Sequence, residues 1–353
     1  MKIHRAYRYE LDPNVEERIL LAKHAGAARF AYNWGLARWI EIYEKEGRTK
    51  NAMELHRELN CLKKTDFPWM YEVSKWAPQE ALRDLEKAFQ NFFRGRIGAV
   101  RLKEKPVRRK KGVVKTHFPK GCILHATVSR EADRWFVSLT VEEEILGPLP
   151  LKGPAAGIDA GLESFTTLAD ETGAIRKTDA PRPLRRALKR LRRLQRKLSR
   201  RGVRDEKGRL IERTKNYEKT RLEIARLHRR IRNIRLDFLH KLTTELVRTH
   251  PVIAIEDLDV AAMLKNRRLA RHIADVGWGT FRALLEAKAK LRGVRLVKAN
   301  RFEPTSKMCH ACGYVLPELP LSVRAWTCPV CGAHHDRDEN AAKNLLRFAL
   351  VAG

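Results

Sequence analysis

The chain has 353 residues, enough for one to three domains with hydrophobic cores, and its 43% of apolar residues exclude a chain that is disordered throughout. Lys and Arg number 73 against 42 acids, a formal net charge of +31; so large an excess needs a polyanionic partner, and nucleic acid is the first candidate. No apolar run approaches eighteen residues and the first residues contain no continuous apolar stretch, so we expect no membrane span, no membrane partner and no secretory signal.

The first 150 residues are expected to combine strands with a helical part. Residues 3–11 alternate as a strand does, and residues from about 14 to 97 have apolar residues at helical spacing. Phe30, Tyr32 and Trp34 fall in that helical part, where we interpret them as core residues, with base stacking as the alternative.

A basic segment and a hairpin follow. Residues 101–116, RLKEKPVRRKKGVVKT, read as a basic loop suited to phosphate contacts. The segments 125–129 and 134–142 alternate on either side of the turn READ, which predicts a β-hairpin. Residues 146–154 contain enough Pro and Gly to form a linker.

Residues 151–353 have the order of a mixed α/β domain. Two strands are expected at 155–162 and 165–173, a long helical stretch at about 183–249, and a strand at 250–260. A helix at 278–293 and a short strand at 294–300 come next, before a cysteine-rich insert and a final helix.

The helical stretch at 183–249 carries much of the positive charge. Residues 181–235 hold 23 Lys and Arg against five acids. Leu184, Leu188, Leu191, Leu194 and Leu198 recur at helical spacing. The pattern predicts a basic helical hairpin that packs through leucines, turns near 199–210 and presents arginines to a nucleic-acid duplex.

Four cysteines have metal-ligand spacing. Cys309 and Cys312 form one CxxC pair, and Cys328 and Cys331 form a second, with fifteen residues between the pairs. This spacing predicts a structural Zn²⁺ with four thiolate ligands and no open position for catalysis. His310, His334 and His335 lie close enough in sequence to substitute as ligands.

The two remaining cysteines, Cys61 and Cys122, are isolated, and we expect them to be buried free thiols. Cysteines used as metal ligands rather than disulfides indicate a reducing compartment, so a cytoplasmic location is expected.

Three carboxylates have the placement of a second, catalytic metal site. Asp159 and Glu256 lie in apolar strand segments, and Asp338 lies at the start of the last helix. Buried acids cost several kcal/mol unless they are paired or bound to metal, and Mg²⁺ prefers oxygen ligands. Individually, Asp159 also reads as a salt-bridged core acid, Glu256 as a surface residue, and Asp336 or Asp338 as a helix N-cap.

The segments GIDAGL, IAIEDL, PTSKMCHACG and CPVC…DRDENAAKNL together resemble the motif set of the TnpB family of transposon-encoded RNA-guided nucleases, relatives of compact type V CRISPR effectors. The resemblance covers nearly the whole chain. It implies an α+β multidomain protein: an RNase H-like (RuvC) mixed α/β nuclease core at 151–353 with a zinc-ribbon insert at about 303–334, and an N-terminal β wedge with a helical recognition insert at 1–150.

The same resemblance implies catalytic, Mg²⁺-binding residues at Asp159, Glu256 and Asp338, since the family's acid in DRDEN is the one two places before Asn. It implies a guide RNA from the transposon end and a double-stranded DNA target cut beside a short adjacent motif, with two Mg²⁺ ions hydrolysing the phosphodiester. A transposase performing strand transfer, a non-catalytic DNA-binding regulator and a CRISPR effector remain alternatives.

Overall fold

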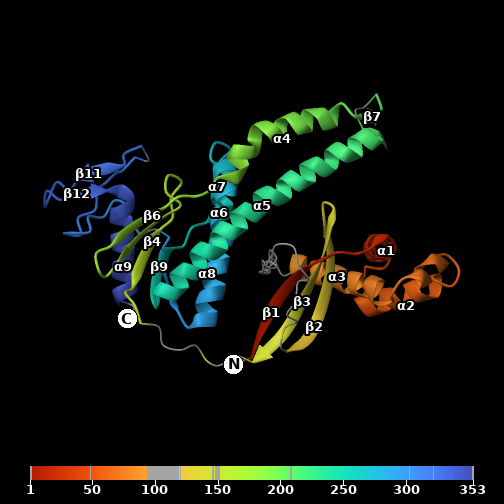
Figure 1. Ribbon diagram of the computed structural model, residues 1–353. Coiled ribbons are helices and arrows are strands. Elements are labelled where there is room, and N and C mark those ends of the chain that lie inside the picture. The colour runs from red at the N-terminus through yellow and green to blue at the C-terminus, as the bar shows by residue number, and fades with distance from the viewer. Residues whose placement is uncertain are drawn as a thin grey trace. The chain divides into compact units, whose positions relative to one another are not determined.

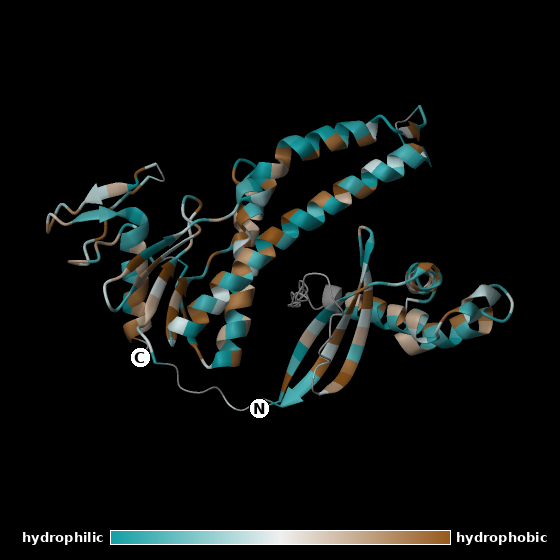
Figure 2. Ribbon diagram, viewed as in Figure 1, coloured by the Kyte–Doolittle hydropathy of each residue, from teal (hydrophilic) through white to brown (hydrophobic). Residues whose placement is uncertain are grey.

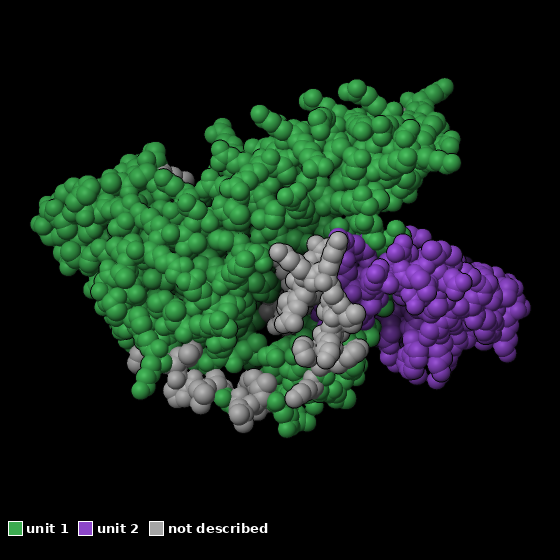
Figure 3. All heavy atoms as spheres, in the orientation of Figure 1, with its two compact units in different colours: residues 1–7, 107–133, 138–353 green, residues 8–106, 134–137 purple. Residues whose placement is uncertain are grey.

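The structure is a computed structural model that describes residues 2–47, 49–93, 119, 121–144, 147, 152–206, 209–301, 303–320 and 322–351. The basic loop expected at 101–116 and most of the linker expected at 146–154 lie outside these residues. The chain divides into two compact units, one of residues 1–7, 107–133 and 138–353 and the other of residues 8–106 and 134–137 (Figure 3). The division at residue 150 stays a prediction.

A five-stranded mixed sheet forms the centre of the larger unit (Figure 1). Its strands are β4 (Ala156–Asp159), β5 (Thr166–Asp170), β6 (Ile175–Thr178), β9 (Val252–Glu256) and β10 (Arg295–Ala299). They lie in the order β10-β9-β4-β5-β6, with β4, β9 and β10 parallel and β5 and β6 antiparallel to their neighbours. Of these strands, β6 was not expected from the sequence.

Helix α9 (Arg337–Val351) packs closely on this sheet because the contact is built from small residues. A Cβ at Gly157 in β4 would lie 2.2 Å from the Ala342 carbonyl oxygen and 2.2 Å from the Leu346 nitrogen. The backbone of α9 is therefore in direct contact with β4, and this contact positions the first turn of α9 relative to the ends of the strands.

Helices α5 (Lys215–Thr249) and α8 (Trp278–Arg292) lie on the other side of the sheet (Figure 1). Phe165, next to β5, contacts Phe238 of α5 and Phe281 of α8 edge to face, each with ring centroids 5.2 Å apart. Two short helices that the sequence did not predict, α6 (Val260–Met263) and α7 (Ala270–Val276), connect β9 to α8.

The predicted basic helical hairpin is confirmed as α4 (Pro183–Ser199) and α5, with a small antiparallel pair, β7 (Gly202–Arg204) and β8 (Leu210–Arg213), at its turn. Leu191 and Leu194 of α4 are buried against Leu227 and Ile231 of α5. Hydrophilic residues cover most of α4 between its leucines (Figure 2). The start of α4 is fixed by Asp275, whose buried carboxylate accepts hydrogen bonds from the first-turn backbone of α4.

The strands at both ends of the first 150 residues form a three-stranded sheet in the order β1-β3-β2, from β1 (Lys2–Leu11), β2 (Cys122–Glu131) and β3 (Arg134–Glu144). The predicted hairpin is therefore present, with its turn at residues 132–133.

The helical part comprises α1 (Val15–Glu46), α2 (Ala52–Leu62), the 3₁₀ helix η1 (Pro68–Glu72) and α3 (Trp76–Phe93). Asn14 and Asn51 each accept a bond from the backbone N–H three residues on and so cap α1 and α2. Phe30, Tyr32 and Trp34 pack against the core of this unit, as interpreted from the sequence.

The expectation for the two isolated cysteines is wrong, because Cys61 and Cys122 are both exposed. The buried residues of α2 are Ala52, Leu55 and Leu59, and Cys61 is two positions beyond the last of them, on the other face of the helix. Cys122 begins a strand, β2, whose side chains are mostly exposed. In the part of the chain that the structure describes, no helix is both long and apolar enough to cross a bilayer.

Candidate active site

The three predicted acids lie at the ends of elements that meet in the larger unit. Asp159 is the last residue of β4 and Glu256 the last residue of β9. These strands are parallel neighbours, with Ile158 paired to Ile255, so both acids stand at the same edge of the sheet. Asp338 is in the first turn of α9, and its Oδ2 would lie 3.8 Å from a Cβ at Gly161, two residues past Asp159.

The electrostatics of this edge are unfavourable to three ionised carboxylates. Asp159 is only 8% exposed, and its pKa is raised well above the usual value, first by burial and then by the charges of Glu256 and Asp338. Burial also raises the pKa of Asp338, although the nearby Arg324 guanidinium opposes the shift. Such an arrangement gains stability from a bound cation.

Two neighbouring side chains contact the acids and were not singled out from the sequence. Arg324 donates to Asp338 over 2.6 Å and pairs with Glu163 over 2.9 Å. The Thr305 hydroxyl donates to Oε1 of Glu256. Arg324 belongs to no recognisable motif, so only its position in space marks it, whereas Thr305 lies inside the segment PTSKMC that contains the first cysteine of the cluster.

Asp336 has a different role from Asp338. Its Oδ1 accepts hydrogen bonds from the backbone N–H groups of Asp338 and Glu339, each over 3.0 Å, so Asp336 caps α9. Lys177 also pairs with Asp336 over 3.0 Å. The capping interpretation therefore applies to Asp336, and Asp338 is left facing the sheet edge.

The four cysteines converge on one point. Their sulfur atoms all lie within 4.8 Å of one another, with Cys309 and Cys331 3.7 Å apart and Cys312 and Cys328 3.6 Å apart. Four thiolates about 2.3 Å from a tetrahedral zinc ion would stand about 3.8 Å apart, so this cluster fits such an ion. His335 is not needed as a ligand and instead lies with its Nε2 3.1 Å from the Cys309 sulfur.

Among the described residues, this is the one group of three or more Cys, His, Asp or Glu whose ligand atoms are mutually so close. The carboxylates of Asp159, Glu256 and Asp338 do not form such a group in the structure. Arg324 donates a hydrogen bond to Asp338, and each of the three acids is attached to a separate element.

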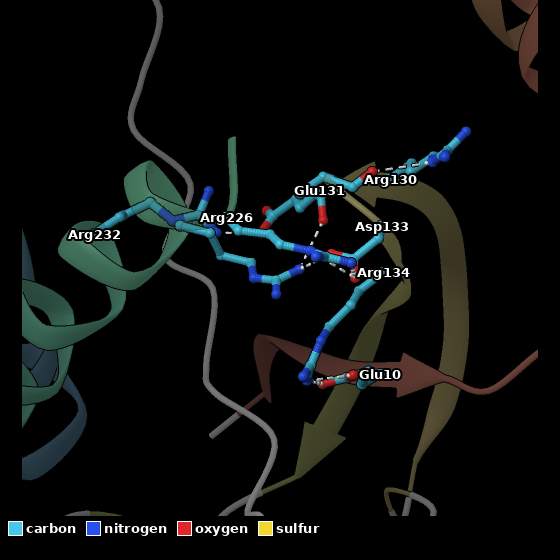
Figure 4. A network of polar contacts seen from close by, with 9 residues as sticks. Glu10, Arg130, Glu131, Asp133, Arg134, Arg226 and Arg232 are labelled. Carbon is cyan, nitrogen blue, oxygen red and sulfur yellow. Dashed lines mark hydrogen bonds and ion pairs between the residues drawn. The ribbon is translucent and has the colours of Figure 1, made fainter. Parts of the chain in front are cut away.

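Two groups of basic residues on the helical hairpin differ in whether acids pair with them. On α5, Arg226 and Arg229 pair with Asp133 over 2.9 and 3.0 Å, and Arg232 pairs with Glu131 (Figure 4). The arginines on Asp133 lower its pKa to about 2.

On α4, by contrast, a set of basic residues lines an open groove, and these residues have no ion-pair partner within the described ranges. They are Lys189, Arg192, Arg193, Arg196, Lys197 and, just after the helix, Arg200. The groove on α4 is therefore a positive surface of the hairpin that no acid of the described residues pairs with.

Comparison with known proteins gives consistent matches along the chain. A family model described as "Probable transposase" matches residues 136–267, and one described as "Cas12f1-like, TNB domain" matches residues 278–345. A third, described as "Helix-turn-helix domain", matches residues 1–48, a region that contains one strand and one long helix here.

Two relatives match almost end to end. A protein of Streptomyces pristinaespiralis named "Putative RNA-guided DNA endonuclease" is 38% identical over 99% of this chain and 90% of its own length. A protein of Escherichia coli strain K12 named "Putative RNA-guided DNA endonuclease InsQ" is 31% identical over 98% of this chain and 92% of its own length. A solved Cas12f1–sgRNA–target DNA complex aligns over 97% of this chain and 98% of that chain at 14% identity, with a TM-score of 0.40.

Proposed function

This chain belongs to the TnpB family, also called OrfB, and from that premise we propose that it is an RNA-guided endonuclease that cuts double-stranded DNA beside a short adjacent motif. The observation that carries the proposal is that three acids meet at one sheet edge, with Asp159 buried and Glu256 and Asp338 half-buried. A site that raises the pKa of its own carboxylate is costly as a purely structural feature and useful as a cation site.

The strand order supports an RNase H-like, RuvC-type core. An antiparallel run β4-β5-β6 is extended on its other side by the parallel strands β9 and β10, and a helix crosses β4. This arrangement puts the carboxyl ends of β4 and β9 next to the first turn of α9.

Asp159, Glu256 and Asp338 would hold Mg²⁺, as two ions if the site follows the pattern of the family. Bound there, the metal supplies water activation and charge neutralisation at the leaving oxygen. Arg324 offers a guanidinium beside Asp338, where it can also meet a phosphate oxygen. The exposed basic residues of α4 offer sequence-independent contacts to nucleic-acid phosphates, while a guide RNA from the transposon end would supply sequence specificity by base pairing.

The first experiment is to purify the protein with its bound RNA, sequence that RNA, and assay cleavage of a plasmid carrying a matching target with Mg²⁺. We expect one RNA species that maps to the end of the element and linear plasmid as product. An Asp159→Ala variant should retain RNA and lose cleavage. Cutting by this variant at the wild-type rate would refute the assigned site.

The products also separate the alternatives. Joined ends from a labelled transposon substrate would indicate strand transfer, the activity suggested by the description "Probable transposase". Binding of target without any break, by a protein with all three acids intact, would indicate a regulator.

For the cysteine cluster we propose a structural Zn²⁺. Cys331→Ser should lower the zinc content and the thermal midpoint, and cleavage should fall because the segment leading into α9 loosens. Cys61→Ser is the matched control, since Cys61 is an exposed thiol outside the cluster. A Cys331→Ser protein with wild-type stability and wild-type cleavage would contradict the link between the zinc site and α9.

A further inference from the structure

Glu256 is held by a neutral donor. Its Oε1 accepts a hydrogen bond from the Thr305 hydroxyl, and Thr305 is 3% exposed. A carboxylate has about four lone-pair sites, so one hydroxyl fixes its rotation and leaves capacity for a cation. A charged donor such as Arg would instead compete with the cation.

Hydrogen bonds from two asparagines of α9 hold the backbone around Thr305. Asn340 and Asn344 are one turn apart on that helix and are 1% and 0% exposed. The Asn344 amide donates to the Thr305 and Met308 carbonyl oxygens over 2.8 and 2.7 Å. The Asn340 amide donates to the same two carbonyls over 3.3 and 2.7 Å.

The same asparagines also hold the backbone of the first cysteine pair. The Asn340 Oδ1 accepts the backbone N–H of His310 over 3.0 Å, so the residues on both sides of Cys309 are tied to α9. The Asn344 Oδ1 is buried without a hydrogen-bond partner, which costs free energy of folding. An apolar side chain would avoid this cost if the position served only for packing. The loop is thus fixed by polar contacts to the helix that also carries Asp338.

We propose that Thr305 is a positioning residue that orients the Glu256 carboxylate for metal binding, and that Asn340 and Asn344 fix Thr305 relative to Asp338. Glu256 and Asp338 come from elements far apart in sequence, and this chain of hydrogen bonds connects them through a third segment. The inference rests on the proposed metal-dependent cleavage and adds to it the residue that sets the geometry of one ligand.

The test compares Thr305→Val, which keeps the shape and removes the donor, with Thr305→Ser, which keeps the hydroxyl. We expect Thr305→Val to raise the Mg²⁺ concentration for half-maximal cleavage by roughly 10–100-fold, the usual effect of removing a partner of a metal ligand. Thr305→Ser should stay within a few-fold of wild type. Zinc content and thermal midpoint without added divalent cation should match wild type in both variants.

A second readout does not require cleavage: the rise in thermal midpoint on adding Mn²⁺, which we expect to be smaller in Thr305→Val than in Thr305→Ser. Equal Mn²⁺ shifts in the two variants, or an unchanged Mg²⁺ dependence in Thr305→Val, would overturn the inference. The inference would also be overturned if Thr305→Val and Thr305→Ser lost cleavage equally and both lost zinc, because that result would indicate a structural role for Thr305. If the two variants differ in their Mn²⁺ shift but the wild-type protein never cuts DNA, the proposed function is refuted and the positioning role stands.

Discussion

At the residue scale, Asp159 is the most informative group in the structure. Its carboxyl is buried next to two other acids, and the raised pKa expresses the cost of ionising it there. In the folded state it therefore keeps its proton to a higher pH than in the unfolded state. Between the usual Asp pKa and the raised one, its contribution to the free energy of unfolding falls as pH rises.

The direction of this pH dependence predicts what happens when the Asp159 carboxylate is replaced by a neutral amide. Asp159→Asn should raise the thermal midpoint of the metal-free protein near pH 7–8 by about 2–4 °C, which corresponds to about 1 kcal/mol for a unit of this size. The gain should vanish near pH 4, where the native carboxyl is already protonated. Calorimetry at the two pH values measures the difference.

Asp338→Asn is the matched control, because it removes an acid of the same site but also breaks the ion pair with Arg324. Its gain should be smaller. A lower midpoint for Asp159→Asn at both pH values would show that the Asp159 carboxylate is stabilised in the fold, contrary to the raised pKa.

The same titration predicts how cleavage depends on pH. Since a proton and a metal ion compete for the Asp159 carboxylate, the Mg²⁺ concentration for half-maximal cleavage should fall as pH rises above the usual Asp range. Measuring the Mg²⁺ dependence at several pH values checks this. A half-maximal concentration that does not change with pH would contradict the assignment of Asp159 as a ligand.

At the scale of elements, the contact between α9 and β4 positions the site. Gly157 allows the helix backbone to touch the strand, and any side chain there would push α9, with Asp338, away from Asp159 and Glu256. Gly157→Ala should therefore lower the free energy of unfolding by about 1–3 kcal/mol and reduce cleavage.

Gly26→Ala provides the comparison, because Gly26 lies in α1 and a Cβ there meets nothing within 4 Å. That substitution should be neutral or stabilising, by up to about 1 kcal/mol. Calorimetry and the plasmid assay on both variants give the measurement. Equal stability of the two variants would show that α9 does not need its close contact with β4.

At the scale of the whole molecule, the net charge is +31, but some basic residues are paired with acids of the protein and others are not. Arg226 and Arg229 on α5 share the single carboxylate of Asp133, while Arg192 and Arg196 on α4 have no ion pair in the described part of the chain. Contacts to nucleic-acid phosphates should therefore depend more on Arg192 and Arg196 than on Arg226 and Arg229.

Salt titration of RNA binding tests this division. Replacing Arg192 and Arg196 with Ala should reduce the slope of log affinity against log salt by about 0.7–0.9 for each phosphate that the protein no longer neutralises. Arg226→Ala should change the slope less, since Arg226 already has a partner in the protein. Equal slopes for the two kinds of variant would contradict the proposed role of α4.

Much of the architecture could be predicted because its signals are local. Alternation and helical spacing located β1, the β2–β3 hairpin, α4, α5 and α8, and the two CxxC pairs located the cysteine cluster. Cys61 and Cys122 were misjudged because one residue type says nothing about which face of an element it occupies. The short elements β6, α6 and α7 have too few residues for a period to show.

The sequence by itself determined the charge and the spacing of the four cysteines, because these are matters of residue type and position, and its motifs, through their resemblance to those of the TnpB family, indicated the family and the three candidate acids. Only the tertiary structure decided that Asp336 caps α9, that Arg324 contacts Asp338, and that Thr305 holds Glu256 while Asn340 and Asn344 hold Thr305. These contacts join residues from separate elements. Apart from the Asp336 cap, they join residues far apart in the sequence, so no local pattern predicts them, and the missing side chain of Gly157 lets α9 pack close to β4.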